Sequence, residues 1–156
     1  MSITNLGGGG VSASVANPWL VIKKSAAESV TSSAAVQLDN HLVFAVEANS
    51  TYVVEYTLHC TGGLSLGGFR NVIAMPALCS GARQMFIGAA TRIESQNLSS
   101  EIAGVGASAT GIITLKAILI VGANAGNAEL YWGQNTSNAT ATTLGVASVV
   151  QYRKTS

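Results

Sequence analysis

The stretch TYVVEYTLHC, residues 51–60, decides the fold class of this chain. Every second side chain in it is large and apolar, and this row consists of Tyr52, Val54, Tyr56 and Leu58. The alternate row is more polar and includes Glu55, Thr57 and His59. Side chains of a β-strand point alternately to its two faces, so this period of two predicts a strand with one face in a hydrophobic core.

The preceding run, HLVFAVEA at 41–48, alternates in the same way. Its more apolar row consists of Leu42, Phe44 and Val46. Asn49 and Ser50 separate the two runs and suit a tight turn. We therefore expect 41–48 and 51–60 to pair as a β-hairpin.

A second long strand is predicted at 111–122, GIITLKAILIVG. One of its two rows is wholly apolar and consists of Ile113, Leu115, Ala117, Leu119 and Val121. Residues 124–127, Asn-Ala-Gly-Asn, predict a turn. After that turn, AELYWGQ at 128–134 is expected to pair back, with Leu130 and Trp132 on the same side.

Shorter strand candidates lie at 19–24, 69–76, 85–94 and 145–154. Residues 25–37 could form a short helix, but their Ser, Thr and Val content weakens it. Strands joined by turns rich in Gly, Asn and Ser predict an all-β, antiparallel β-sandwich. We expect a jelly-roll-like sandwich, with an immunoglobulin-like one as the second choice, in a single domain spanning 19–156.

Residues 1–18 precede this domain and have the composition of an extended N-terminal arm. Four consecutive glycines, Gly7–Gly10, disfavour a helix or a central strand, and Pro18 closes the segment. Apolar residues are spaced along it, namely Ile3, Leu6, Val11 and Val15. Two interpretations stand side by side: an arm that contacts a neighbouring subunit on assembly, and a frayed terminus.

The low content of charged residues limits the kinds of partner that this chain could bind. Only 10% of the residues are charged, against about 25% in an average protein, and the net charge is +1. Such a chain is prone to associate, so we expect it to assemble with copies of itself or with a larger structure. The eight Lys and Arg residues are scattered and form no basic patch, which argues against nucleic acid. No apolar run is long enough for a transmembrane helix, so no membrane partner is expected.

The chain offers little material for catalysis. His41, His59, Asp39 and Cys60 would approach one another at the open end of the predicted hairpin, but their spacing matches no metal motif. We therefore expect no catalytic residue, no metal and no cofactor. Cys60 and Cys79 allow one disulfide, but two buried thiols are the expected state, because free Cys behaves as a small hydrophobe and nothing in the sequence indicates secretion.

The candidate contact residues lie in ELYWGQNTSNATATTL, residues 129–144. Tyr131 and Trp132, beside Gln134 and Asn135, could form a glycan platform, although a Trp on a sandwich strand is more often buried. Thr142 and Thr143 suit an interface between symmetric copies, where like charges would face one another. These six residues are therefore candidates for an interface or a glycan site.

The segment 128–154, AELYWGQNTSNATATTLGVASVVQYRK, resembles the C-terminal end of a β-sandwich module in virion proteins of tailed bacteriophages. That module ends in a strand, a Gln-Asn turn rich in Ser, Asn and Thr, a Thr-Thr pair and a strand closing on an Arg, here Leu130–Gln134, Asn135–Thr140, Thr142-Thr143 and Ala147–Arg153. Residues 21–58 are similar to the module's opening, with an Asp-X-X-Leu strand and an Ala-Asn-X-Thr-Tyr turn. The middle of the chain, 60–110, departs from the pattern.

The resemblance implies a non-enzymatic phage structural protein, with two competing placements. The first is a trimeric capsid decoration (cement) protein, made in the host cytoplasm, that binds the major capsid protein on the exterior of the virion head. The second is a minor tail or fibre-associated protein for host attachment, with Tyr131 and Trp132 exposed to glycans. A tail fibre would more often be a longer chain, which favours the capsid. A hydrolase or lectin would need acids clustered around an aromatic groove, and the sequence shows none.

Overall fold

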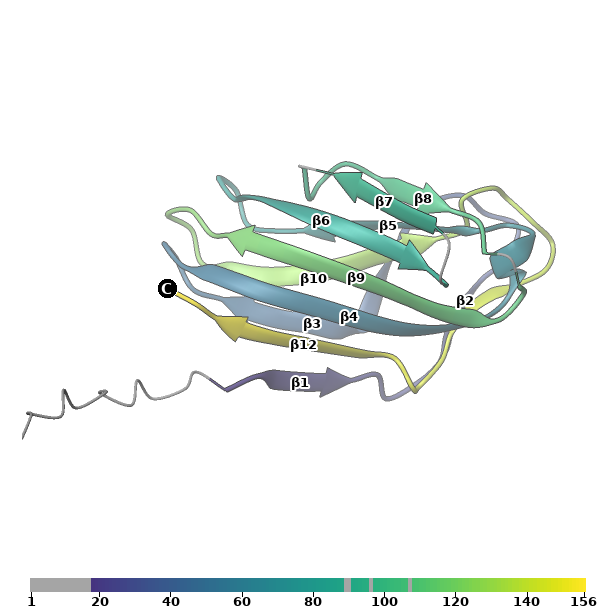
Figure 1. Ribbon diagram of the computed structural model, residues 1–156, viewed down its shortest axis with the longest axis horizontal. Coiled ribbons are helices and arrows are strands. Elements are labelled where there is room, and N and C mark those ends of the chain that lie inside the picture. The colour runs from purple at the N-terminus through teal and green to yellow at the C-terminus, as the bar shows by residue number, and fades with distance from the viewer. Residues whose placement is uncertain (1–17, 89–90, 96, 107) are drawn as a thin grey trace, which may run out of the picture.

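Strands dominate the computed structural model, which describes residues 18–156 apart from 89–90, 96 and 107. They form two antiparallel sheets that face one another, with the larger sheet in front in Figure 1. The described residues contain a single helix, the three-residue 3-10 turn Gly63–Ser65. The predicted all-β antiparallel sandwich is therefore confirmed.

The large sheet has eight strands. Its main path, in spatial order, is β1 (Leu20–Lys23), β12 (Val149–Lys154), β4 (Thr51–Gly62), β9 (Gly111–Ile120), β6 (Ser80–Ile87) and β7 (Thr91–Ser95). Two short strands extend it, because β11 (Thr142–Leu144) pairs with both β4 and β2 (Glu28–Val30). The small sheet has four strands in the order β3 (Gln37–Val46), β10 (Gly126–Gly133), β5 (Phe69–Ala74) and β8 (Ile102–Gly104).

The pairing is nested along the chain. Strand β1 pairs with β12, β3 with β10, β4 with β9, and β5 with β8, all antiparallel. Consecutive long strands therefore pass from one sheet to the other. This nesting makes most contacts long-range in sequence and joins the two sheets at several points along the chain.

Both hairpins expected from the sequence are wrong for this reason. Strand β3 lies in the small sheet and β4 in the large one, and Asn49, with φ of 53°, lies in the crossing between them. Strands β9 and β10 are likewise in different sheets. Alternation tells which side chains face the core but not which strand is the neighbour. Both edges of β4 are occupied by strands distant in the sequence, β12 on one side and β9 on the other. The pairing of β4 with β9 runs without a register shift from Thr51 to Cys60.

The core lies between the sheets. The row predicted from residues 51–60, Tyr52, Val54, Tyr56 and Leu58, is buried. So are the predicted rows of 41–48 and 111–122, and burial of each large apolar side chain stabilises the fold by about 1.5–3 kcal/mol. Both cysteines are free thiols, and Cys60 is buried as predicted, whereas Cys79 is only half-buried.

Other boundaries differ from expectation in detail. Candidates 19–24, 69–76 and 145–154 contain β1, β5 and β12. The single strand expected at 85–94 is instead parts of β6 and β7, which pair across a turn that begins at Gly88, whose φ is 61°. Residues 25–37 contain the short strand β2 and no helix, because β2 pairs with β11 and tertiary pairing outweighs a weak helix propensity.

Candidate interaction surface

The outward side of the large sheet carries a polar row that crosses five strands. The strand register aligns its members, which are Gln151, Glu55, Lys116, Gln84 and Glu94. Lys116 Nζ lies 3.5 Å from Glu55 Oε2, and Glu94 forms an ion pair with Arg92. Glu55 and Lys116 are therefore paired across neighbouring strands, whereas Glu94 is paired with Arg92 of its own strand.

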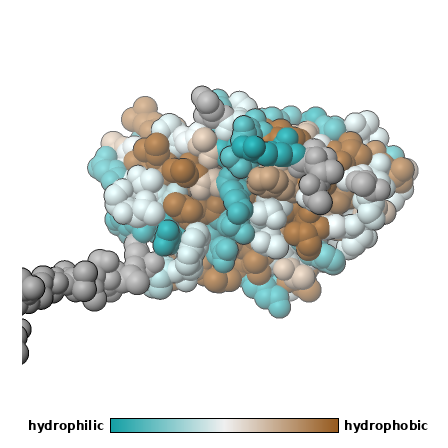
Figure 2. Space-filling view, in the orientation of Figure 1, coloured by the Kyte–Doolittle hydropathy of each residue, from teal (hydrophilic) through white to brown (hydrophobic). Residues whose placement is uncertain are grey.

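Apolar side chains flank the polar row on both sides, and Figure 2 shows brown areas on either side of a teal band. Three isoleucines of the central strand β9 point outward and are about half exposed: Ile112 at 47%, Ile118 at 51% and Ile120 at 49%. On neighbouring strands, Val53 and Ala82 lie directly beside Ile118. We call this outward surface of β12, β4, β9, β6 and β7 the large-sheet face.

The large-sheet face is hollowed near its middle. A depression of about 420 Å³ is lined by Val53, Ala82 and Ile118 together with Lys116 and Glu94. The side chain of Ala82 is shorter than that of Ile118 beside it, which leaves room above it. The hollow offers an apolar floor and a polar rim, the arrangement that accepts an apolar side chain.

The small sheet presents a different exterior. None of the large hydrophobic residues that are exposed in the described part of the chain lies on β3, β5, β8 or β10. On the strands these residues occur on β1, at Leu20 and Val21, and on β9. An antiparallel sheet with one solvated face normally carries polar residues there, so exposed isoleucines on a central strand indicate an interaction surface.

Trp132, a candidate from the sequence, does not reach the surface. Its side chain is fully buried on β10 and stacks on Phe69, with ring centroids 6.1 Å apart. Leu130 shares its side, as predicted, and that side faces the core. Trp132 is therefore not accessible to a glycan, contrary to the glycan-platform prediction, because the alternation of β10 turns its side chain toward the core.

Gln134 and Thr142 are also fully buried. The Gln134 side chain holds its loop, because Nε2 donates to the carbonyl of Thr140 (2.8 Å) and Oε1 accepts from the amides of Ser33 (3.4 Å) and Asn138 (3.0 Å). The amide side chain of Gln134 therefore binds backbone groups on both sides of this loop. The prediction that Gln134 and Thr142 contact a partner is therefore wrong, because neither side chain is accessible.

The remaining candidates are half-buried. Tyr131 Oη lies 3.4 Å from Glu129 Oε2 on the exterior of the small sheet. The carbonyl of Asn135 accepts from Arg70 Nη2 at 3.2 Å, and Thr143 Oγ1 lies 2.7 Å from Ser29 Oγ. The structure does not bring the six candidates together into one exposed patch. The arm candidates Ile3, Leu6, Val11 and Val15 lie outside the described residues.

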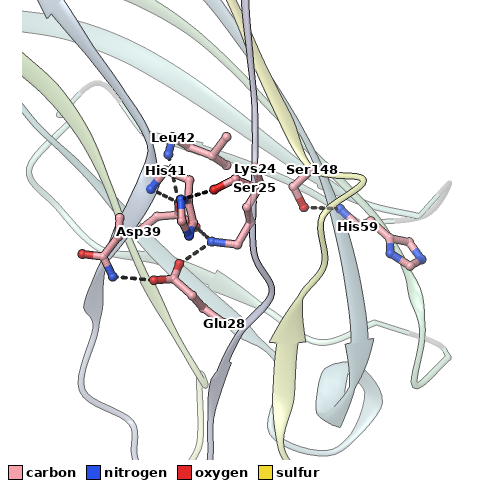
Figure 3. A network of polar contacts seen from close by, with 9 residues as sticks. Lys24, Ser25, Glu28, Asp39, His41, Leu42, His59 and Ser148 are labelled. Atoms are coloured by element: carbon pink, nitrogen blue, oxygen red, sulfur yellow. Dashed lines mark hydrogen bonds and ion pairs between the residues drawn. The ribbon is translucent and has the colours of Figure 1, made fainter.

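A buried ionic network, which the sequence did not reveal, joins the two sheets. Lys24, in the link between β1 and β2, is buried and points toward β3 (Figure 3). Its Nζ lies 2.6 Å from Oδ2 of the fully buried Asp39 and also pairs with Glu28. Asn40 donates to the other oxygen of Glu28, and Ser25 Oγ lies 2.9 Å from His41 Nδ1. The network fixes the edge of the large sheet to the edge strand of the small one.

Asp39 also shapes β3 locally. The pairing of β3 with β10 shifts register between Glu129, which faces Val43, and Tyr131, which faces Leu38. Inside this bulge Asp39 Oδ1 accepts from the amides of His41 (3.0 Å) and Leu42 (2.9 Å). The Asp-X-X-Leu pattern at 39–42 was the one sequence signal that could have marked this site, since Asp side chains often bind amides two or three residues ahead.

A second buried polar group lies on the inner side of the large sheet. Arg83 on β6 donates from Nη2 to the carbonyls of Asn71 (3.1 Å) and Ser100, while its Nε and Nη1 have no partner among the described residues. Burial lowers the pKa of Arg83 to about 10, an effect that Tyr56 opposes. Burial, followed by the charge of Asp39, raises the pKa of the Tyr56 phenol well above its usual range. Burial also raises the pKa of the Cys60 thiol to about 12.

Among the described residues, no group of three His, Cys, Asp or Glu side chains is placed to hold a metal ion. His41 and His59 lie on different sheets, so the cluster drawn from the expected hairpin does not form. The three-residue helix is too short to cross a membrane, and the described part of the chain has no other helix. Comparison with family models, curated proteins and solved structures gave no match to this chain.

Proposed function

We propose that this chain is a non-enzymatic structural protein of a tailed-bacteriophage virion, a capsid decoration protein that assembles with itself as a homotrimer. It would be made in the host cytoplasm and bind the major capsid protein on the exterior of the head. The phage assignment rests on the resemblance of 128–154 and 21–58 to virion β-sandwich modules. The observation that carries the assembly role is the large-sheet face, whose central strand exposes three isoleucines.

The strand order supports the finer part of the fold assignment, the jelly roll. In a jelly roll a long antiparallel ribbon is folded over so that strands pair from the outside inward. The pairs β1 with β12, β3 with β10, β4 with β9, and β5 with β8 follow that order. The hairpin of β6 and β7 is then an insertion that widens the large sheet.

The tail placement has less support. Its glycan-binding form needs Trp132 on the surface, and this side chain is buried against Phe69. Tyr131 alone is half-buried beside Glu129 and has no second aromatic residue of the candidate set next to it on the surface. A single half-buried ring is a weak platform for a sugar, so we retain the capsid placement.

The test is a sedimentation experiment with purified protein and phage head shells that lack it. The oligomeric mass is first measured by light scattering, and the protein is then mixed with shells and pelleted. A trimer that pellets with shells supports the proposal. A protein that ignores shells but attaches to host cells would move it to the tail, and one that does neither would overturn the virion assignment.

A deletion of residues 2–15 tests the proposed arm. If the arm clamps a neighbour on the shell, the deleted protein keeps its oligomeric mass and its circular dichroism spectrum but no longer pellets with shells. Undiminished binding would show that the arm has no role in attachment. The full chain, measured at the same concentration, is the control.

A further inference from the structure

We infer that the large-sheet face is the surface through which one copy of this chain contacts a second copy, with the contact centred on Ile118. This inference rests on the self-assembly in the proposed function and assigns it to one surface. It also gives Ile112, Ile120 and the hollow above Ala82 a common role.

The size of the large-sheet face fits a stable protein interface. The five strands of the face have between five and twelve residues, and at about 4.8 Å per strand and 3.4 Å per residue they cover roughly 670 Å². A standard interface buries about 800 Å² on each partner. The strand β9, which runs through the middle of the face, has ten residues. The strands of the face therefore supply most of the area of such an interface, and the loops that flank them supply the rest.

The charges of the face favour a neutral partner. Glu55 pairs with Lys116 and Arg92 with Glu94, and Arg153 on the β12 side lies over the Trp19 ring, so the middle of the face carries no strong charge of either sign. Such a surface gives a nucleic acid or another highly charged partner little to bind. The chain itself has a net charge of +1, so a second copy approaches without appreciable repulsion.

The order of charges along the polar row also suits self-association. Glu55 and Lys116 occupy adjacent strands, and Glu94 follows two strands beyond Lys116. An offset of one strand toward β4 between two copies therefore sets Lys116 opposite Glu55 of the neighbouring copy. Opposite charges then meet across the interface, which selects this arrangement over one in which like charges coincide.

Knob and hollow occur on the same face. Ile112 and Ile120 project near the two ends of β9, and the depression of about 420 Å³ beside Val53 and Ala82 lies between them. A face that carries both an apolar projection and an apolar recess can bind a copy of itself head to tail, with the projection of one copy in the recess of the next, which is the kind of contact that the ring of a homotrimer requires. Polar residues around the recess provide the rim that such interfaces have.

The experiment compares two charge substitutions at matched exposure. Ile118→Glu lies at the centre of the face, whereas Val105→Glu lies in the loop after β8, and the native side chains at these positions are 51% and 47% exposed. The oligomeric mass of each variant is measured by sedimentation equilibrium across a concentration series, with circular dichroism as the check on folding. We expect Ile118→Glu to weaken association by at least a factor of ten and Val105→Glu to leave it unchanged.

A thiol-protection measurement keeps the inference testable if Ile118→Glu does not fold. Ile118→Cys is made in a Cys79→Ser background, where the remaining native thiol, Cys60, is buried. In the oligomer its reaction with a polymer-linked maleimide should be slow, and it should become fast on dilution to monomers. Val105→Cys in the same background should react fast at both concentrations.

The outcomes separate the inference from the proposed function. A wild-type chain that is monomeric at all concentrations would overturn self-assembly itself. An oligomer that survives Ile118→Glu, or in which the thiol of Ile118→Cys stays reactive, would overturn this surface while leaving self-assembly intact. A face that becomes protected only when shells are added would assign it to the capsid protein and overturn the second copy as its occupant.

Discussion

Lys24 and Arg83 are both buried cations, but the protein surrounds them differently. Lys24 lies between two carboxylates, with Asp39 at 2.6 Å and Glu28 also in contact. Arg83 is held by backbone carbonyls of Asn71 and Ser100, and within the described part of the chain no carboxylate forms a salt bridge with it. One region therefore balances charge with charge, whereas the other offers only dipoles.

This difference between the surroundings of Lys24 and Arg83 indicates which buried polar groups the stability of the fold depends on most. The Lys24 network connects the link between β1 and β2 to the bulge of β3. Its ion pairs therefore hold the two sheets in one relative position (Figure 3). Around Arg83 and Tyr56, desolvation dominates and moves both pKa values away from their usual ranges. Removing one member of a balanced buried pair leaves a bare charge, so the first region should be the more sensitive.

The largest effect is expected for Asp39→Ala. This change leaves Lys24 buried without its closest fully buried carboxylate and removes the acceptor for the amides of His41 and Leu42. Loss of one partner of a buried ion pair costs about 3–5 kcal/mol. The free energy of unfolding in urea should fall by that amount, which can leave the variant largely unfolded.

Two companion variants divide the Asp39 effect. Asp39→Asn keeps an oxygen for the amides and removes the charge, so it should lose less than Asp39→Ala. Glu28→Ala removes the carboxylate that is 15% exposed, where water can replace it in part. Equal losses for Asp39→Ala and Glu28→Ala would show that burial does not distinguish the two carboxylates and would break the comparison.

Arg83→Met is expected to cost less, about 1–3 kcal/mol. The change leaves the carbonyls of Asn71 and Ser100 without this donor, which destabilises the fold. It also removes a desolvated charge that no carboxylate balances, which offsets part of that loss. Urea unfolding again measures the effect, and Arg92→Met, at an exposed ion pair, is the control that should change stability by under about 0.5 kcal/mol. A loss as large as that of Asp39→Ala would place Arg83 in a balanced network after all.

Period-two alternation made the core predictable. In 51–60, 41–48 and 111–122 it identified the buried rows, because shifting a strand by one residue would turn its whole apolar set to solvent. It could not identify strand neighbours, which is why both hairpins were wrong. In 128–134 the two rows carry Trp132 and Tyr131, so the sequence alone did not decide which aromatic ring faces the core.

The sites were harder to predict than the core. Lys24 and Asp39 are fifteen residues apart and meet only because β1 and β3 lie at corresponding edges of two sheets. The large-sheet face, by contrast, is indicated by a pattern in the sequence. In residues 111–122 the row opposite the core carries Ile112, Ile118 and Ile120 beside Thr114 and Lys116, so it is more apolar than a solvated strand face normally is. That second row was the sequence signal that could have located this surface.

The free energy of unfolding should depend on pH through the buried thiol of Cys60. Burial raises the thiol pKa from an ordinary 9.0 to about 12, so above pH 9 the unfolded chain loses a proton that the folded chain keeps. The contribution of Cys60 to stability is therefore complete below pH 9 and is lost as pH rises toward 12. Between pH 9 and pH 10 the loss is about 1 kcal/mol.

The matched variants for this effect are Cys60→Ala and Cys79→Ala. The free energy of unfolding is measured at pH 9 and pH 10 for both variants and for the wild type. Cys60→Ala should lack the decline that the thiol causes, whereas Cys79→Ala leaves Cys60 in place and should keep it. The same decline in all three proteins would assign it to other groups.

The smallest effect is expected for Tyr56→Phe. The Tyr56 hydroxyl is buried and has no hydrogen-bond partner among the described residues, so its removal should change the free energy of unfolding by less than about 1 kcal/mol and can raise it. Tyr52→Phe is the control, because the Tyr52 hydroxyl accepts from the amide of Glu47 at 3.1 Å and its loss should cost about 1 kcal/mol. If Tyr56→Phe were the more destabilising of the two, the hydroxyl would have to be bonded in solution. Tyr56 would then connect Asp39 to Arg83, and the two buried cations would belong to one network.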